Sequence, residues 1–301
     1  MKTLLSVALA AAVSPIAFAA ADCGDFPNRP IEVMVPYRAG GAVDIAARTL
    51  ANAAAEVKGW DLRIANRTGA GTVTGQEYLA NQAPRDGYTV GVMPLLAAVL
   101  NEADAGNGIE PGSIDVLEAI FFDPWLFVAR PGETIDSLVA RGEQGRLRYA
   151  YSPGSEQSML GGVFERRHGF EMARVPLDGG VNRIGGVLNG SVDIAPTFYG
   201  EAKQYLDSGV VTPLGYANDA PYWAGEDIPA LTNEGYDFGA NFWGAYRVIF
   251  TPAGVPDEIK ACLADGFTEI LSSEAGKAIF MEQGIRTEPV GYAEASATYP
   301  R

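Results

Sequence analysis

Short apolar segments and longer amphipathic segments alternate along the first hundred residues of the chain. Residues 31–35, 62–66 and 88–93 have the length and the β-branched content of buried strands. A glycine-bearing loop follows each of the first two. An alanine-rich segment at 42–58, ended by Gly59, and a segment at 72–83 are then predicted to form helices. Repeated units of strand, loop and helix predict a parallel sheet with crossover helices.

The same unit recurs in the second half of the chain. We predict strands at 147–151, 173–177 and 192–196, and helices at 158–168 and 181–189. Apolar runs at 117–128 and 242–250 flank this half, and two helices at 257–271 and 274–283 follow the second run. Residues 101–113 contain three glycines and few large apolar side chains, so we expect a surface loop there.

This organisation predicts an α/β protein of two lobes, each a mainly parallel sheet flanked by helices. The 301 residues exceed what a single core of about 150 residues serves, which agrees with two lobes. We assign 22–123 together with 247–301 to lobe 1 and 124–246 to lobe 2. The chain would cross between the lobes near 121–128 and again near 242–250, so that its last helices return to lobe 1.

The first residues are typical of an export signal. Lys2 provides a positive start, residues 4–13 form a short apolar core, and Ala17-Phe18-Ala19 offers small residues at cleavage spacing, so we expect a signal peptide at 1–21. The apolar core is shorter than the roughly 18 residues of a spanning helix. The chain has two cysteines, Cys23 and Cys262, and in an oxidising compartment a disulfide between them is favoured over two buried thiols.

The charge excludes one class of partner. Asp and Glu number 37 against 22 Lys and Arg, a formal charge of −15, whereas a nucleic-acid-binding protein needs a basic face. An anionic small molecule is still compatible with this charge, because salt screens distant surface charges within about 10 Å and backbone N–H groups bind anions locally.

Four loops at predicted strand ends could bind such an anion. Each lies between a strand and a helix, where free N–H groups and the helix dipole favour negative charge, and ligands of open parallel sheets bind at this edge. A purely structural role as tight turns or helix caps is the alternative for each loop. The candidate residues are Tyr37, Arg38, Ala39, Gly40 and Gly41 in the first loop, Thr68, Gly69, Ala70, Gly71 and Thr72 in the second, Ser152, Gly154 and Ser155 in the third, and Thr197 and Phe198 in the fourth. Arg38, a permanent cation, could pair with a carboxylate or lie on the surface.

Catalytic and metal-binding patterns are missing from the sequence. The single histidine, His168, ends a predicted helix beside Arg166 and Arg167, which indicates an exposed cation at the helix C-terminus rather than a general base. No serine stands in a G-x-S-x-G frame, and no carboxylates have a metal-binding spacing. We therefore expect neither an enzyme nor a cofactor or metal site.

The motifs together resemble the periplasmic receptors of tripartite tricarboxylate transporters, the Bug receptors. The resemblance covers nearly the whole mature chain and fits in both order and spacing. It rests on PNRPI from Pro27, VPYRAGG from Val35 with Asp44 and Arg48, NRTGAG from Asn66, DGYT from Asp86, SPGS from Ser152, LNGSVD from Leu188, EGY from Glu234 and PAGVP from Pro252.

The resemblance implies a Venus flytrap fold with a ligand in the interdomain cleft, and delivery to two membrane subunits of a transporter. It implies a small carboxylate ligand, held by the loop matching Tyr37 to Gly41 and by loops of lobe 2, with Asp44 tying the first loop to its helix. The sequence departs from the family pattern at Arg38 and Thr68, where proline is usual, so the ligand could be a dicarboxylate, a tricarboxylate, an amino acid or an aromatic acid. We expect a monomer that binds no nucleic acid. The alternatives are a ligand-sensing subunit for a signalling protein and, with less support, an enzyme on a similar scaffold.

Overall fold

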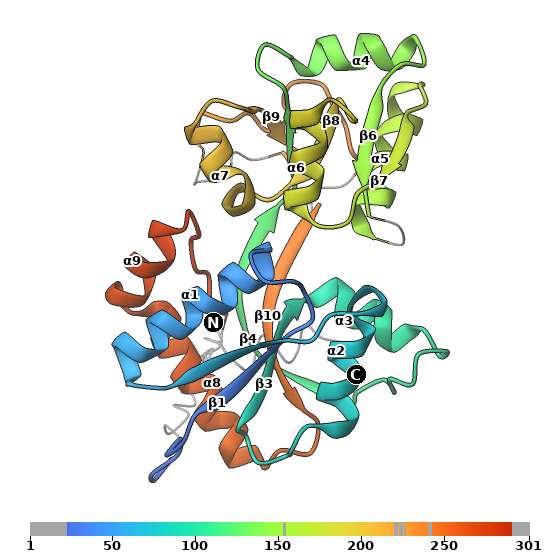
Figure 1. Ribbon diagram of the computed structural model, residues 1–301. Helices are drawn as coiled ribbons and strands as arrows, with labels where there is room; N and C mark the ends of the chain where they lie inside the picture. The colour runs from blue at the N-terminus through green and yellow to red at the C-terminus, as the bar shows by residue number, and fades with distance from the viewer. Residues whose placement is uncertain are drawn as a thin grey trace, which may run out of the picture.

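The protein is described here by a computed structural model that covers residues 23–152, 155–219, 222, 225, 227–239 and 243–290. It consists of two lobes, each built around a five-stranded sheet, and Figure 1 shows them one above the other. We call the part around the first sheet lobe 1 and the part around the second sheet lobe 2. The expected signal peptide, Gly154 and Phe242 lie outside the described residues.

Lobe 1 contains the sheet β2-β1-β3-β10-β4. Its strands are β1 (Ile31–Val35), β2 (Leu62–Asn66), β3 (Thr89–Pro94), β4 (Ile114–Pro124) and β10 (Gly244–Pro252). Its helices are α1 (Ala42–Lys58), η1 (Ala70–Thr72), α2 (Val73–Glu77), η2 (Tyr78–Gln82), α3 (Leu95–Ala103), α8 (Asp257–Ser272) and α9 (Glu274–Glu282). β1, β2 and β3 are parallel, and β10 is antiparallel to both β3 and β4.

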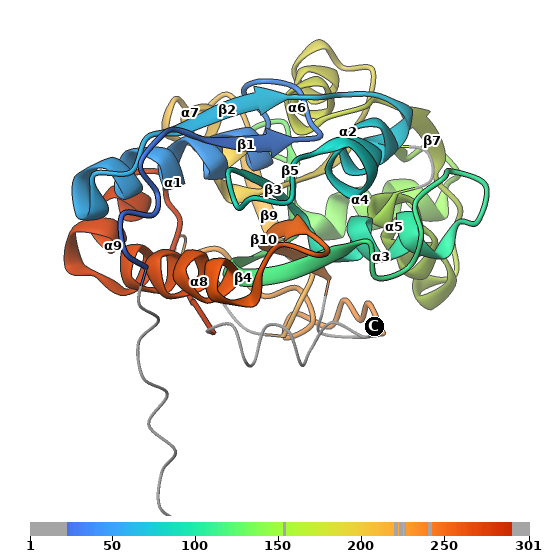
Figure 2. The same cartoon turned by 90° about the horizontal axis from the view of Figure 1, so that it is seen from below.

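Both faces of the lobe 1 sheet are covered, which explains why its strands are apolar throughout. Val33 and Val35 of β1 pack in the core under α1, α8 and α9, whereas Met34 points to the opposite face, where it packs beside Leu79. Figure 2 shows α1, α8 and α9 gathered on one side of the sheet and α2 and α3 on the other. This layering leaves the carboxyl ends of β1, β2 and β3 as the uncovered edge.

Lobe 2 repeats this plan with the sheet β7-β6-β8-β5-β9. Its strands are β5 (Leu126–Ala129), β6 (Arg148–Tyr151), β7 (Ala173–Pro176), β8 (Ile194–Thr197) and β9 (Thr212–Tyr216), and its helices are α4 (Ile135–Glu143), α5 (Glu156–His168), α6 (Gly180–Asn189) and α7 (Tyr199–Asp207). β7, β6 and β8 are parallel, while β5 is antiparallel to β8 and β9. The chain passes between the sheets from β4 to β5 and from β9 to β10.

The prediction of a two-lobed α/β protein with mainly parallel sheets is confirmed, and β10 and β5 are the antiparallel strands of the two sheets. β1, β2 and α1 have the predicted bounds. The expected surface loop at 101–113 is wrong at its start, because α3 continues to Ala103. Sequence reasoning also missed α3, α4, α7 and β9. β9 reads TPLGY, and its proline and glycine hide the strand signal.

The predicted disulfide between Cys23 and Cys262 is present, with the two Cα atoms 5.7 Å apart. It fastens the segment before β1 to α8, where Cys262 is buried. The cross-link joins segments 239 residues apart in sequence, both belonging to lobe 1. The return of the last helices to lobe 1 and the disulfide therefore support each other.

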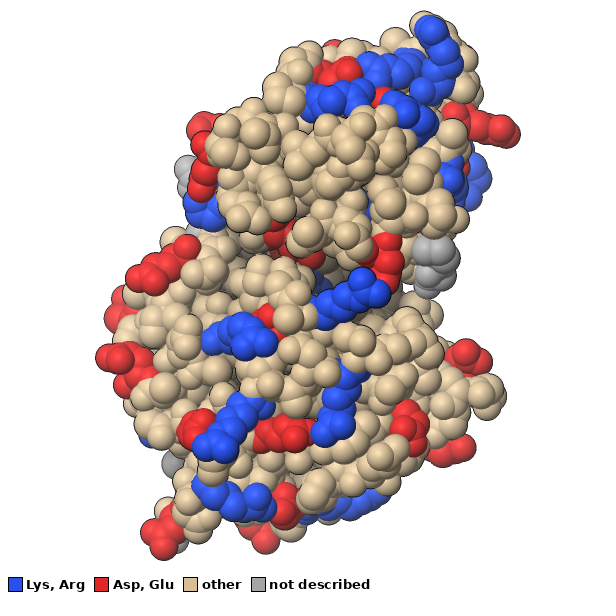
Figure 3. Space-filling model, viewed as in Figure 1, with Lys and Arg blue, Asp and Glu red and all other residues tan. Residues whose placement is uncertain are grey.

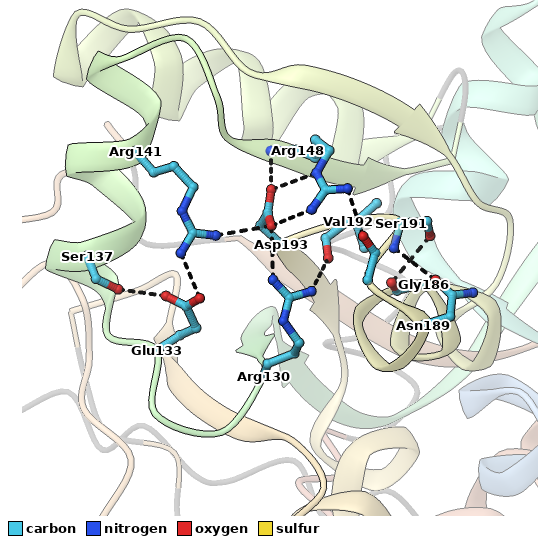
Figure 4. A network of polar contacts seen from close by, with 11 residues as sticks. Arg130, Glu133, Ser137, Arg141, Arg148, Gly186, Asn189, Ser191, Val192 and Asp193 are labelled. Atoms are coloured by element: carbon cyan, nitrogen blue, oxygen red, sulfur yellow. Dashed lines mark hydrogen bonds and ion pairs between the residues drawn. The ribbon is translucent and has the colours of Figure 1, made fainter.

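One polar network fixes the end of lobe 2 where β6 and β8 begin. Arg130, Arg141 and Arg148 converge on the carboxylate of Asp193, as Figure 4 shows, with N–O distances of 3.2, 3.1 and 2.8 Å. The backbone N–H of Arg148 also donates to Asp193, at 2.9 Å. Glu133 pairs with Arg141 at 2.7 Å. The network lies at the amino ends of these strands, away from the edge that carries the predicted binding loops.

Candidate binding cleft

The loop between β1 and α1 is held by the carboxylate of Asp44. The N–H of Gly40 donates to Asp44 Oδ2 at 2.8 Å, Arg48 Nε donates to the same oxygen at 2.8 Å, and Asn66 Nδ2 donates to Asp44 Oδ1 at 2.9 Å. Asn66 also donates to the carbonyl of Tyr37 at 2.9 Å. Burial by itself would raise the pKa of Asp44, but the hydrogen bonds from Arg48, Gly40 and Asn66 lower it, so the carboxylate stays ionised.

The predicted ligand residues of this loop differ in their surroundings. Arg38, Ala39 and Gly40 are exposed, and Gly41 is half-buried. The half-buried Tyr37 packs on the lobe 1 core. Burial raises the pKa of Tyr37 to about 12; Arg247 opposes this shift, whereas Asp178 and Glu156 of lobe 2 add to it. The phenol of Tyr37 is therefore within electrostatic reach of charged groups from the other lobe.

The second predicted loop, 68–72, combines exposure with backbone strain. Thr68, Gly69, Ala70 and Gly71 are exposed. Ala70 and Thr72 are the non-glycine residues at positive φ in the described chain, with values of 45° and 95°. Thr72 is buried, and its hydroxyl oxygen accepts a hydrogen bond from Asn101 at 2.8 Å. Such strain concentrates at functional loops, and it is consistent with a binding role here.

In lobe 2, the loop after β6 contacts a buried arginine. Arg183 of α6 donates through Nη1 to the hydroxyl of Ser152 at 3.1 Å and through Nε to the carbonyl of Pro196 at 2.7 Å. Burial lowers the pKa of Arg183. The hydroxyl of Ser155 donates to the carbonyl of Ser152, and Ser155 is also the N-cap residue of α5. Arg183 thus positions the Ser152 side chain at the carboxyl end of β6.

The loop after β8 connects the two lobes through Glu201 of α7. Glu201 accepts from the hydroxyl of Thr197 at 3.1 Å and from the N–H of Phe198 at 3.3 Å. Its other oxygen accepts from the N–H of Ala42, at the first turn of α1, at 3.2 Å. Phe198 stacks on Trp125, with ring centroids 3.8 Å apart. The predicted residues Thr197 and Phe198 therefore lie where lobe 2 meets the first loop of lobe 1.

The residue that sequence reasoning missed is Arg247, in the strand β10 that links the lobes. Its side chain is 1% exposed. The guanidinium lies 4.3 Å from the centroid of the Phe198 ring, and its nearest carboxylate oxygen, on Asp123, is 3.6 Å from Nη2. Within the described residues, Nε and Nη2 of Arg247 have no hydrogen-bond partner. The sequence signal that could have identified Arg247 is its charge within the apolar run at 242–250.

Two carboxylates beside Arg247 have raised pKa values. Burial raises the pKa of Asp123 to about 7; Arg247 lowers it and Glu201 raises it further. Burial also raises the pKa of Glu156 to about 7, against the effects of the Trp125 indole, the Gly244 N–H and Arg247. The N–H of Gly244 donates to Glu156 Oε1 at 3.1 Å. Both acids therefore titrate near neutral pH.

These groups come from both lobes and from the strands that connect them. Figure 3 shows the surface hollowed between the upper and lower lobes, with acidic side chains along the upper side of the hollow. We call this region the cleft; it brings together Tyr37 of lobe 1, Glu156, Thr197, Phe198 and Glu201 of lobe 2, and Asp123, Trp125 and Arg247 of the connections. Its chemistry is a buried guanidinium with free N–H groups surrounded by carboxylates and aromatic rings.

The single histidine, His168, does not belong to the cleft. His168 is half-buried, with its ring centroid 4.8 Å from that of Phe164 and 5.5 Å from that of Tyr236, so the expected exposed helix-end cation is wrong. The imidazole ring is half-buried because it packs against the Phe164 ring. Among the described residues, no group of three potential metal ligands comes together and no helix has both the length and the apolar character needed to cross a bilayer.

Comparison with known proteins identifies a family of receptors. The family described as tripartite tricarboxylate transporter family receptor matches residues 46–291. Protein BugT of Bordetella pertussis is 28% identical over 277 residues, which covers 86% of this chain and 81% of BugT.

Solved structures of similar fold agree. A protein of R. palustris, solved with adipate, has a TM-score of 0.76 and 24% identity, covering 89% of this chain and 90% of that one. MatC of Rhodopseudomonas palustris, solved with bound malate, has a TM-score of 0.71 and 24% identity, covering 86% and 90%.

Proposed function

Because the chain belongs to the tripartite tricarboxylate transporter receptor family, we propose that it captures a small carboxylate in the cleft and delivers it to the membrane subunits of such a transporter. The protein would act in the periplasm after removal of the signal peptide at 1–21. The lobes would divide at the proposed boundaries, 22–123 with 247–301 and 124–246, and close around the ligand by rotation at the two connections.

One observation carries this proposal: the buried guanidinium of Arg247, with two nitrogens that lack a hydrogen-bond partner among the described residues. An unpaired buried charge is costly, and native proteins keep such groups where a ligand completes them. A carboxylate offers two oxygens in the geometry that a guanidinium fork accepts. The surroundings of Arg247 therefore favour a carboxylate over a neutral solute.

The loops of both lobes would complete the site. The first loop exposes Ala39, while the N–H groups of Gly40 and Gly41 hold the loop through Asp44 and Arg38, and Ser152 and Thr197 bring hydroxyls to the strand ends of lobe 2. Arg38 would contribute from the exposed rim. The adipate and malate of the two R. palustris structures belong to those proteins, but they support a carboxylate as the ligand class here.

A thermal-shift screen of the mature protein against carboxylates tests this function. The panel would contain mono-, di- and tricarboxylates, amino acids and aromatic acids, with neutral sugars as controls. A true ligand at about 100 times its Kd stabilises the folded state by about 2.7 kcal/mol, which gives a shift of a few degrees. A carboxylate that shifts the melting temperature and is recovered unchanged supports a receptor. Conversion of the ligand would establish an enzyme, and no response to any acid would refute the proposed site.

Sensing is the second candidate function, since a closed lobe surface can be recognised by a signalling protein as well as by a permease. Binding of the closed form to detergent-solubilised transporter subunits, compared with binding of the ligand-free form, separates the two roles. The transport proposal expects tighter binding of the ligand-loaded form.

A further inference from the structure

The walls of the cleft carry more carboxylates than cations. Asp123 and Glu201 are buried there and Glu156 is half-buried, while Arg183 and Arg247 are the buried cations. Two N–H groups of Arg183 already donate within lobe 2, to Ser152 and Pro196. A purely anionic ligand would add its charge to this excess of carboxylates, at a cost in free energy that rises as water is excluded.

Glu156 differs from the other acids of the cleft. Asp123 faces Arg247 at 3.6 Å, and Glu201 accepts hydrogen bonds from Thr197, Phe198 and Ala42. Glu156 accepts the N–H of Gly244, and the Trp125 indole also favours its charged form, but no lysine, arginine or histidine of the described chain lies within ion-pair distance of it. A half-buried carboxylate without a cation beside it lacks a partner for its charge, just as Arg247 lacks acceptors for two of its nitrogens.

The two incomplete groups face the same space. Glu156 lies at the first turn of α5 in lobe 2, and Arg247 on β10 is close enough to lower the pKa of Glu156. Both groups also act on the phenol of Tyr37, across the cleft in lobe 1. A small molecule that carries one positive and one negative group could therefore contact Glu156 and Arg247 at the same time.

We propose that Glu156 is a subsite for an ammonium group, so that the cleft selects small amino acids, whose carboxylate pairs with Arg247, over the same acids without the amine. This inference rests on the proposed function and narrows its ligand class. The rim residue Asp178 has the same sign and adds to the attraction for the amine. The stacked rings of Trp125 and Phe198 lie beside the Arg247 guanidinium, which is 4.3 Å from the Phe198 centroid.

The charges predict opposite pH dependence for the two ligand types. An ammonium group needs ionised Glu156, so its affinity rises as pH increases through about 7, the pKa of that carboxyl. A carboxylate without an amine binds better when Glu156 and Asp123 are protonated, so its affinity falls over the same range. The other groups facing Glu156 are Tyr37, Arg247 and the Trp125 indole, none of which changes charge between pH 6 and 8.

Calorimetry on matched ligand pairs tests this inference. The pairs are L-glutamate and glutarate, L-aspartate and succinate, 4-aminobutyrate and butyrate, and L-phenylalanine and 3-phenylpropionate, each at pH 6 and pH 8. We expect at least one amino acid to bind about tenfold or more tightly than its partner, with a ratio that widens at pH 8. If only the acids without an amine bind, the subsite is refuted and the carboxylate receptor stands; if no member of any pair binds, the proposed function itself is in question.

Glu156→Gln isolates the charge, because the amide oxygen still accepts the Gly244 N–H. We expect the variant to lose about tenfold in affinity for the amino acid and to keep or gain affinity for its deaminated partner. Glu171→Gln, at an exposed position of the same lobe, is the matched control and should change neither. Equal weakening of both partners would assign Glu156 a structural role and overturn the subsite. The pH series on the unaltered protein decides the matter independently if the variant folds poorly.

Discussion

Lobe 2 and the cleft each contain a cluster of charged side chains, and the charge at the centre of one cluster is opposite to that of the other. At the outer end of lobe 2, one carboxylate, Asp193, is surrounded by three arginines, and its side chain is 2% exposed (Figure 4). In the cleft, one arginine, Arg247, is surrounded by carboxylates and is 1% exposed. Asp193 accepts several hydrogen bonds, whereas Nε and Nη2 of Arg247 donate to no acceptor in the described chain.

The difference separates a charge that is fully paired within the fold from one that we propose a ligand completes. Hydrogen bonds and ion pairs with Arg148 and Arg130 overcome the effect of burial and hold the pKa of Asp193 at about 2. In the cleft, burial dominates, and it raises the pKa of Asp123 to about 7 although Arg247 is near. Completed pairing indicates structure, and incomplete pairing of a buried group indicates a binding site.

The largest effect on stability should follow from Asp193→Ala. Three guanidinium groups and one backbone N–H would lose their common acceptor, which costs about 3 kcal/mol because a buried pair is broken while its partners remain. Chemical denaturation measures the loss. Ligand affinity of the folded variant should stay unchanged, since the network lies away from the cleft. A large loss of affinity would show that the Asp193 cluster also contributes to binding.

Arg247→Met should have the reverse profile. Removing Arg247 leaves Asp123 without its ion pair, but this carboxyl, whose pKa is already raised to about 7, can take up a proton, so we expect little change in stability at pH 6. Carboxylate affinity should fall by about 100-fold, or about 2.7 kcal/mol, because the guanidinium supplies the main charge-assisted contact. Denaturation together with calorimetry checks both halves. A destabilised variant with normal affinity would assign Arg247 to the fold.

The two clusters should also respond to pH in opposite directions. Asp193 has a pKa below its unfolded value, so its contribution is present above about pH 4 and is lost as pH falls towards 2. Asp123 and Glu156 have raised pKa values, so the ligand-free protein should lose stability as pH rises from about 4 to about 7. We expect a decrease on the order of 2 kcal/mol for each of the two carboxyls between pH 5 and pH 8.

Unfolding by urea at a series of pH values measures this dependence. Asp123→Asn and Glu156→Gln should each flatten the profile above pH 5, because the group that titrates is removed. A profile that is unchanged in both variants would show that these carboxyls do not titrate near neutral pH in the folded protein.

The smallest effect should come from Arg38→Ala. Arg38 is exposed on the rim of the cleft, so any contact with a ligand is screened by water, and we expect less than about a threefold loss in affinity. Calorimetry with the ligand found in the screen gives the ratio. A loss as large as that of Arg247→Met would make Arg38 the main carboxylate contact, as the sequence by itself permitted.

The sequence determined the principal strands and helices and their order along the chain. Strand bounds at 31–35 and 62–66, the helix at 42–58 and the left-handed Gly59 follow from local periodicity and capping, so no tertiary information was needed for them. The disulfide was predictable because a chain with an expected export signal and two cysteines offers one pairing. Short elements such as β9 were missed, since their proline and glycine obscure the pattern.

Only the tertiary structure decided which charge is buried. Arg38 and Arg247 are the same residue type, and the glycine-rich loop around Arg38 makes it the stronger candidate in the sequence. The burial and hydrogen bonding of Arg247 depend on Asp123, Phe198 and the β3 and β4 strands beside β10, which lie up to 158 residues away along the chain. The local sequence pattern indicates which helix or strand a segment forms. The burial of a charged side chain and its ion pairs depend on neighbours that only the assembled lobes bring together.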